Sequence, residues 1–107
     1  MDPTLTPTRT ERTEVRNLNR HTSYLIRTAW ASFAEPARFT GDTRDGQMTA
    51  VASSIKVRRV GDHEVEAWVF GSRVLDDGSV VTERTTTLSL DPVPAWAVTL
   101  LANEVPA

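Results

Sequence analysis

The chain contains no cysteine, and this absence removes several kinds of chemistry at once. Disulfide cross-links, thiolate catalysis and zinc sites with cysteine ligands all require that residue. Long apolar runs are missing too: no stretch approaches the roughly 20 residues that span a bilayer, and no secretory signal pattern opens the chain. We therefore expect no membrane association, and a location in the cytoplasm or in a particle assembled there.

The sequence also lacks the familiar catalytic motifs, including a glycine-rich phosphate loop, an HExxH pair and a nucleophile elbow. The residues that could supply acid–base or metal chemistry are His21, Glu66 and the run Asp62-His63-Glu64. That run falls on a predicted hairpin turn, where no pocket is implied. We expect a non-enzyme that holds neither a cofactor nor a metal.

What is present fits one small domain. The 107 residues are 39% hydrophobic and 24% charged, enough for a single modest core. The charges are polarised along the chain: residues 1–60 hold ten arginines or lysines and six acids, whereas residues 61–107 hold two and eight. Such polarity can mark a face for an acidic partner, or head-to-tail contacts between copies.

Residues 1–12 consist mainly of threonine, proline and arginine, with Leu5 among them. A segment of this composition cannot bury enough surface to hold itself in place, so we expect an extended N-terminal arm that lies on a neighbouring chain. Residues 13–107 are then expected to form a single α+β domain.

Residues 14–34 allow two interpretations. Six apolar residues fall on one side of a helix drawn at 100° per residue: Val15, Leu18, Leu25, Ile26, Ala29 and Phe33. This pattern predicts an amphipathic helix ended by the proline that follows. The competing interpretation is a strand over 21–33, where good β formers stand at alternate positions. We favour the helix.

Three extended segments follow, over 48–60, 64–75 and 80–90. Gly61-Asp62 and Asp76-Asp77-Gly78 join them as tight turns, which predicts an antiparallel meander whose middle strand is covered on both faces. Asp91-Pro92 then reads as a helix start. The predicted fold is an α+β domain in the order α-β-β-β-α, with one helix at each end of the three-stranded meander and the arm in front.

Four arginines carry the most specific binding signal. Arg12, Arg16, Arg20 and Arg27 would form a ridge along the first helix, able to pair with phosphates or a partner's carboxylates. If the segment is a strand, this ridge does not exist. A second basic cluster, Lys56, Arg58 and Arg59, is explained by cross-strand pairing with Glu64 and Glu66 across the predicted turn.

The three tryptophans fall one in each helix and one in the middle strand, as expected if these elements meet in one core. Trp96, near the start of the last helix, is our candidate for an interface anchor.

Three functions remain open on these grounds. The first is a non-catalytic structural or interaction protein, a small subunit that forms a homo-oligomer or docks on a larger assembly; a phage virion component from a GC-rich host would fit. The second is a nucleic-acid-binding module that uses the arginine ridge, and the third is a small regulator or inhibitor of a host protein.

Overall fold

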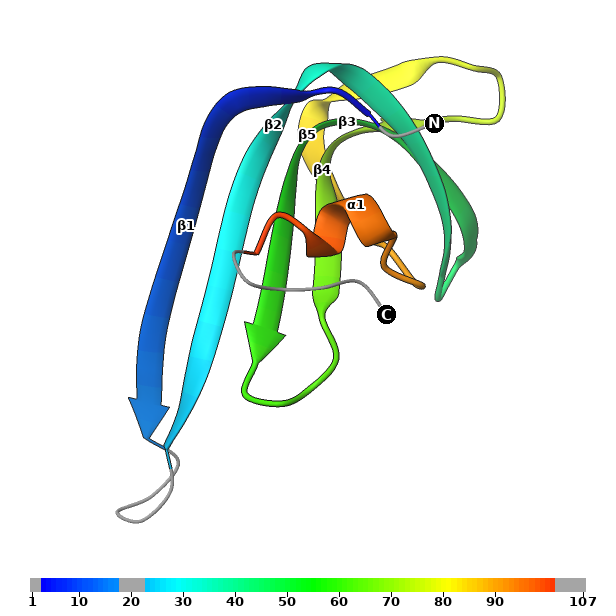
Figure 1. The fold of residues 1–107 in the computed structure, drawn as a ribbon. Coiled ribbons are helices and arrows are strands. Elements are labelled where there is room, and N and C mark those ends of the chain that lie inside the picture. The colour runs from blue at the N-terminus through cyan, green and yellow to red at the C-terminus, as the bar shows by residue number, and fades with distance from the viewer. Residues whose placement is uncertain (1–2, 18–22, 102–107) are drawn as a thin grey trace.

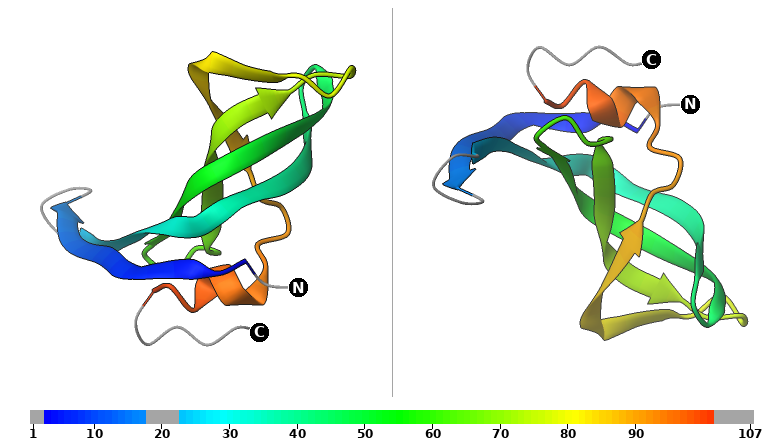
Figure 2. Two further views of the ribbon diagram at one scale, coloured as in Figure 1. Left: turned by 90° about the horizontal axis from the view of Figure 1, so that it is seen from above. Right: turned by 90° about the horizontal axis from the view of Figure 1, so that it is seen from below.

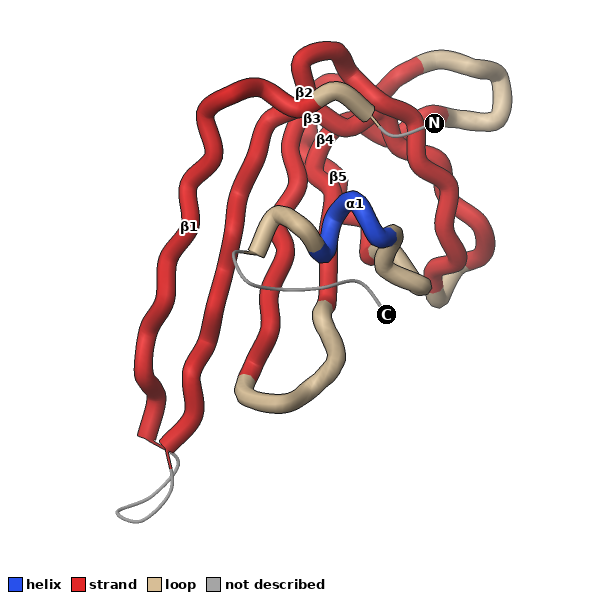
Figure 3. Tube along the Cα trace, viewed as in Figure 1, coloured by secondary structure: helices blue, strands red, loops and turns tan. Residues whose placement is uncertain are grey.

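The computed structural model describes residues 3–17 and 23–101. Five antiparallel strands follow one another in chain order across a single sheet: β1 (Leu5–Asn17), β2 (Ser23–Thr43), β3 (Gly46–Val60), β4 (Glu66–Val74) and β5 (Val80–Ser89). The sheet curls into a half-barrel, and a single short helix, α1 (Ala95–Val98), lies in its hollow (Figure 1). Figure 3 shows how little of the described chain is helical.

The predicted α+β fold is therefore wrong, and the first helix is the main error. Residues 14–17 belong to β1, and residues 23–34 belong to β2. Val15 and Leu25, counted above in the buried stripe of a helix, are 64% and 50% exposed. Ala29, Ala31 and Phe33 are buried and alternate along β2 as they do on one face of a strand, while Ile26 and Thr28 are buried on the other face.

The N-terminal segment is likewise not a free arm, since residues 5–12 form the first part of β1 and pair with β2. The register of this pair shifts between Leu5 and Arg9, a stretch that contains Pro7. Proline has no N–H to give to a ladder, and it is tolerated at an edge strand or an irregularity of this kind.

The last three strands were predicted to within two residues at each end. The turn after β4 is built as its sequence suggests: Gly78 has φ +87°, and its N–H donates to the carbonyl of Leu75 at 2.9 Å. Asp77 Oδ1 accepts bonds from the hydroxyl and backbone N–H of Ser79, and these bonds lower the pKa of the Asp77 carboxyl.

The final helix begins later than predicted. Its first helical residue is Ala95, and Pro94 stands at the N-cap position without a side-chain cap. A proline disfavours helical geometry in the residue before it, so Pro94 opposes a helix that starts from Asp91-Pro92, and residues 91–94 are not helical.

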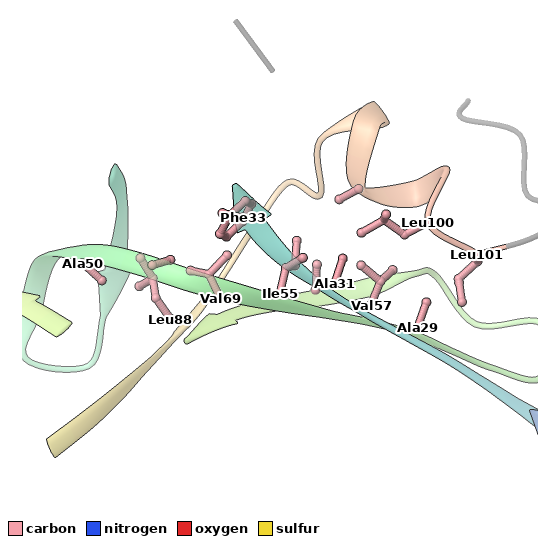
Figure 4. Packing of buried hydrophobic residues seen from close by; sticks show 13 residues of the cluster. Ala29, Ala31, Phe33, Ala50, Ile55, Val57, Val69, Leu88, Leu100 and Leu101 are labelled. Carbon is pink, nitrogen blue, oxygen red and sulfur yellow. The ribbon is translucent and has the colours of Figure 1, made fainter. Parts of the chain in front are cut away.

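The core lies between the hollow of the sheet and the segment 95–101, which we call the helical cap. Ile55, Val57 and Val69 share one buried cluster with Leu100 and Leu101 of this cap, and Figure 4 shows Val57 below Leu100. Small residues dominate the cluster: six of its thirteen members are alanines. We call this side of the sheet the concave face and the other side the convex face.

Candidate interaction surfaces

The predicted arginine ridge does not form, because it required a helix. Arg12 and Arg16 lie in β1 with side chains 69% and 60% exposed, each 3.8 Å from a carboxylate oxygen of Glu14. Arg27 lies in β2 opposite Thr13, at a position whose side chain belongs to the concave face. Arg20 lies outside the described residues, as does His21.

Trp96 packs inside the hollow. Its ring centroid is 6.2 Å from that of Phe33 and 6.3 Å from that of Phe39, and the residue is half-buried. An open groove of about 490 Å³ runs past it between Thr4 and Arg38. The role of Trp96 as an interface anchor stays a prediction.

The other candidates for chemistry are not gathered into a site. Glu66 pairs with Arg58, Nη2 to Oε1 at 3.2 Å, as the cross-strand interpretation predicted. Asp62, His63 and Glu64 are exposed at the turn between β3 and β4. Over residues 3–17 and 23–101, no three histidine or acidic side chains converge where they could bind a metal. In the same ranges, no helix has the length and apolar character needed to cross a membrane.

The first surface that stands out is the outer edge of β1. Gly61 N–H donates to the carbonyl of Leu25 at 2.7 Å, so the backbone groups of Leu25 face β3 and not β1. Residues facing each other in an antiparallel pair alternate between those that exchange hydrogen bonds and those that do not. Val15, which is opposite Leu25, therefore directs its N–H and C=O away from β2.

The same alternation applies along the regular part of β1. Thr13, Glu11 and Arg9 stand two, four and six residues before Val15, and they also direct their backbone groups outward. In the part of the chain that the structure describes, no strand lies beyond β1. Figure 1 shows this part of β1 as a straight strand at the border of the sheet.

The second surface is the middle of the convex face. Trp30, Lys56 and Trp68 are directly opposite one another on β2, β3 and β4. Phe70 follows on β4, and Arg58 follows on β3. All five are half-buried, and we call them the convex aromatic patch. Among the described residues no helix or strand covers them, because the helical cap lies on the opposite side of the sheet (Figure 2).

This patch was not expected from the sequence, because the pattern predicted Trp30 and Trp68 in the core. The signal that could have found it is alternation. In β4, Ala67 and Val69 are the small and β-branched residues suited to a crowded interior, whereas Trp68 and Phe70 belong to the other face. The expectation that β4 is covered on both faces is thus wrong within the described residues.

Comparison with known proteins adds no identity. No family model, curated protein or solved structure matches the chain.

Proposed function

We propose that the chain is a non-catalytic structural protein, a subunit that joins a second copy of itself through the outer edge of β1. The observation that supports this proposal is the regular stretch Arg9–Asn17, whose outward backbone groups have no partner strand among the described residues. Such an edge is a template for pairing with another chain.

The charges of β1 select one register for this pairing. Two antiparallel copies related by a two-fold axis at Thr13 would place Arg12 of each copy opposite Glu14 of the other. If the two-fold axis lay one residue earlier, Arg12 would be opposite Arg12 of the other copy, and if it lay one residue later, Glu14 would be opposite Glu14. Like charges directly opposite each other are destabilising. Thr13 is also the midpoint of the regular stretch Arg9–Asn17.

An isologous contact of this kind closes on itself and gives a dimer with one continuous sheet. In the single chain, Arg12 and Glu14 interact only loosely at 3.8 Å, and Arg12 is largely exposed. Both are thus available to form pairs across the axis. The exposed Val15 would lie opposite Glu11 of the other copy and lose part of its contact with water.

The test is the molar mass in solution, measured by light scattering coupled to size-exclusion chromatography. We expect twice the 11.8 kDa of one chain. Thr13→Pro removes an outward N–H that the fold of the single chain does not use, so it should give a folded monomer. Thr13→Ala keeps that N–H and should remain dimeric.

Charge exchange tests the register itself. Glu14→Arg places two arginines opposite each other and should favour the monomer, whereas the double variant Arg12→Glu with Glu14→Arg restores the pairing and should recover the dimer. Far-UV circular dichroism establishes that each variant is folded. A wild-type monomer at every concentration, or a Thr13→Pro dimer as stable as the wild type, would contradict the proposal; a monomer would favour the regulator or inhibitor instead.

A further inference from the structure

We infer that the convex aromatic patch is a binding site for single-stranded nucleic acid. The inference does not depend on the proposed dimer, because the patch lies on β2, β3 and β4 and not at the edge formed by β1.

The patch places cations between aromatic rings. Lys56 has Trp30 as its neighbour on β2 and Trp68 as its neighbour on β4. Its Nζ lies 5.7 Å from the centroid of the Trp68 ring, and the Cζ of Arg58 lies 4.9 Å from the same ring. These cation–π contacts hold two long side chains in place at the surface, which lowers the entropy lost when they bind an anion.

The charge around the patch differs in sign from the charge of the whole protein. The chain has a net charge of −2. On the convex face, however, Lys56 and Arg58 add two positive charges, and the acid paired with Arg58 is Glu66, whose side chain is 52% exposed. Many of the other acids lie at the ends of hairpins, in the turns that follow β2, β3 and β4: Asp45, Asp62, Glu64, Asp76 and Asp77. The middle of the face is therefore locally basic and complements a polyanion.

The aromatic residues distinguish a nucleic acid from other polyanions. Bases of single strands stack on aromatic side chains presented by a sheet, while neighbouring cations bind the phosphates. Lys56 and Arg58 are two residues apart on β3, hence about 6.7 Å apart along the strand. Successive phosphates of an extended strand have a similar separation. Trp30 is opposite Lys56 on β2 and Phe70 is diagonal to Lys56 on β4; both are half-buried, and bases would stack on them.

The experiment measures fluorescence anisotropy of a fluorescein-labelled oligothymidylate titrated with the full chain at low salt, with labelled polyglutamate as a polyanion that has no bases. We expect binding of the oligonucleotide that weakens as salt rises. Lys56→Glu should reduce the affinity by about tenfold or more and lower the slope of log affinity against log salt by about 0.7. Arg44→Glu, an equal charge change at the exposed turn between β2 and β3, should have little effect.

Trp30→Leu and Phe70→Leu keep apolar side chains and remove the flat rings, so each should weaken oligonucleotide binding by about tenfold. Circular dichroism verifies that these variants fold. The monomeric Thr13→Pro variant should still bind, which separates a failure of this inference from a failure of the proposed dimer. The inference is overturned if the oligonucleotide does not bind, or if Lys56→Glu binds it as well as Arg44→Glu does. It is also overturned if polyglutamate binds as tightly as the oligonucleotide and Trp30→Leu changes the affinity for neither ligand. That third outcome would indicate an acidic protein as the partner of this face.

Discussion

The two faces of the sheet differ in the size of the side chains that they carry. The concave face, which the helical cap covers, is lined largely by alanine, and Ala29, Ala50 and Ala52 are fully buried. The convex face, made by the same strands, carries Trp68 and Phe70 only half-buried. Curling a sheet reduces the space above its inner surface, so small residues fit there. Phe33, Phe39 and Trp96 pack together in the hollow, whereas Trp30, Trp68 and Phe70 stand on the outside, where they are available for binding.

The largest expected effect comes from a cavity on the concave face. Ile55 is fully buried, so Ile55→Ala should lower the free energy of unfolding by about 2–5 kcal/mol. Lys56→Ala, one residue further along β3 and on the other face, should cost less than about 1 kcal/mol. Urea unfolding at one fixed protein concentration measures both, because association would change the apparent stability. Equal losses would contradict the difference between the faces.

A smaller loss is expected where β3 and β4 approach most closely. The register of these strands shifts between Ala52 and Ser54, opposite Gly71. A Cβ on Gly71 would collide with the carbonyl oxygen of Val51 and would lie 2.6 Å from the Cα of Ala52. Gly71→Ala should therefore lower the free energy of unfolding by about 1–3 kcal/mol.

The same urea experiment with Ser72→Ala provides the control for Gly71→Ala. Ser72 is the next residue on β4, and its substitution should change the free energy of unfolding by no more than about 0.5 kcal/mol. If Gly71→Ala is as stable as Ser72→Ala, the close approach of the two strands does not require glycine.

The smallest effect is expected from the ion pair on the convex face. Glu66→Gln removes the partner of Arg58 from a pair whose side chains are 35% and 52% exposed, so the loss should be below about 1 kcal/mol and should shrink in high salt. Glu64→Gln, at an exposed acid outside that pair, is the matched control. A loss above about 2 kcal/mol would show that this face contributes to the fold as strongly as the core does.

Sequence patterns predicted the structure correctly where it depends on contacts between residues that are close in the chain. The segments from residue 46 to residue 89 fold as strands joined by short turns, and the residues of those turns are visible in the sequence. Asp77 and Gly78 each make a turn contact within three residues. The cross-strand pair Arg58 and Glu66 could be predicted for the same reason, since a single turn separates them.

Sequence patterns failed where pairing partners decide the structure. The apolar residues of 14–34 match a helical period as well as a strand period, and only the neighbouring strands settle the outcome. Ala31 contacts β1 and β3 at once, opposite Arg9 and Ile55. The arginine ridge failed with the helix, because a strand sends Arg12 and Arg27 to opposite faces. The convex aromatic patch joins three strands and could not be assembled from any one of them.

The helical cap is made from residues that follow all five described strands in the chain. A ribosome therefore completes all five strands before residues 95–101 emerge to cover the alanine-lined hollow. Until then the nascent sheet exposes Ile55, Val57 and Val69 to the cell. A chain interrupted after β5 would carry a nearly complete sheet with an open apolar interior, a species prone to aggregation.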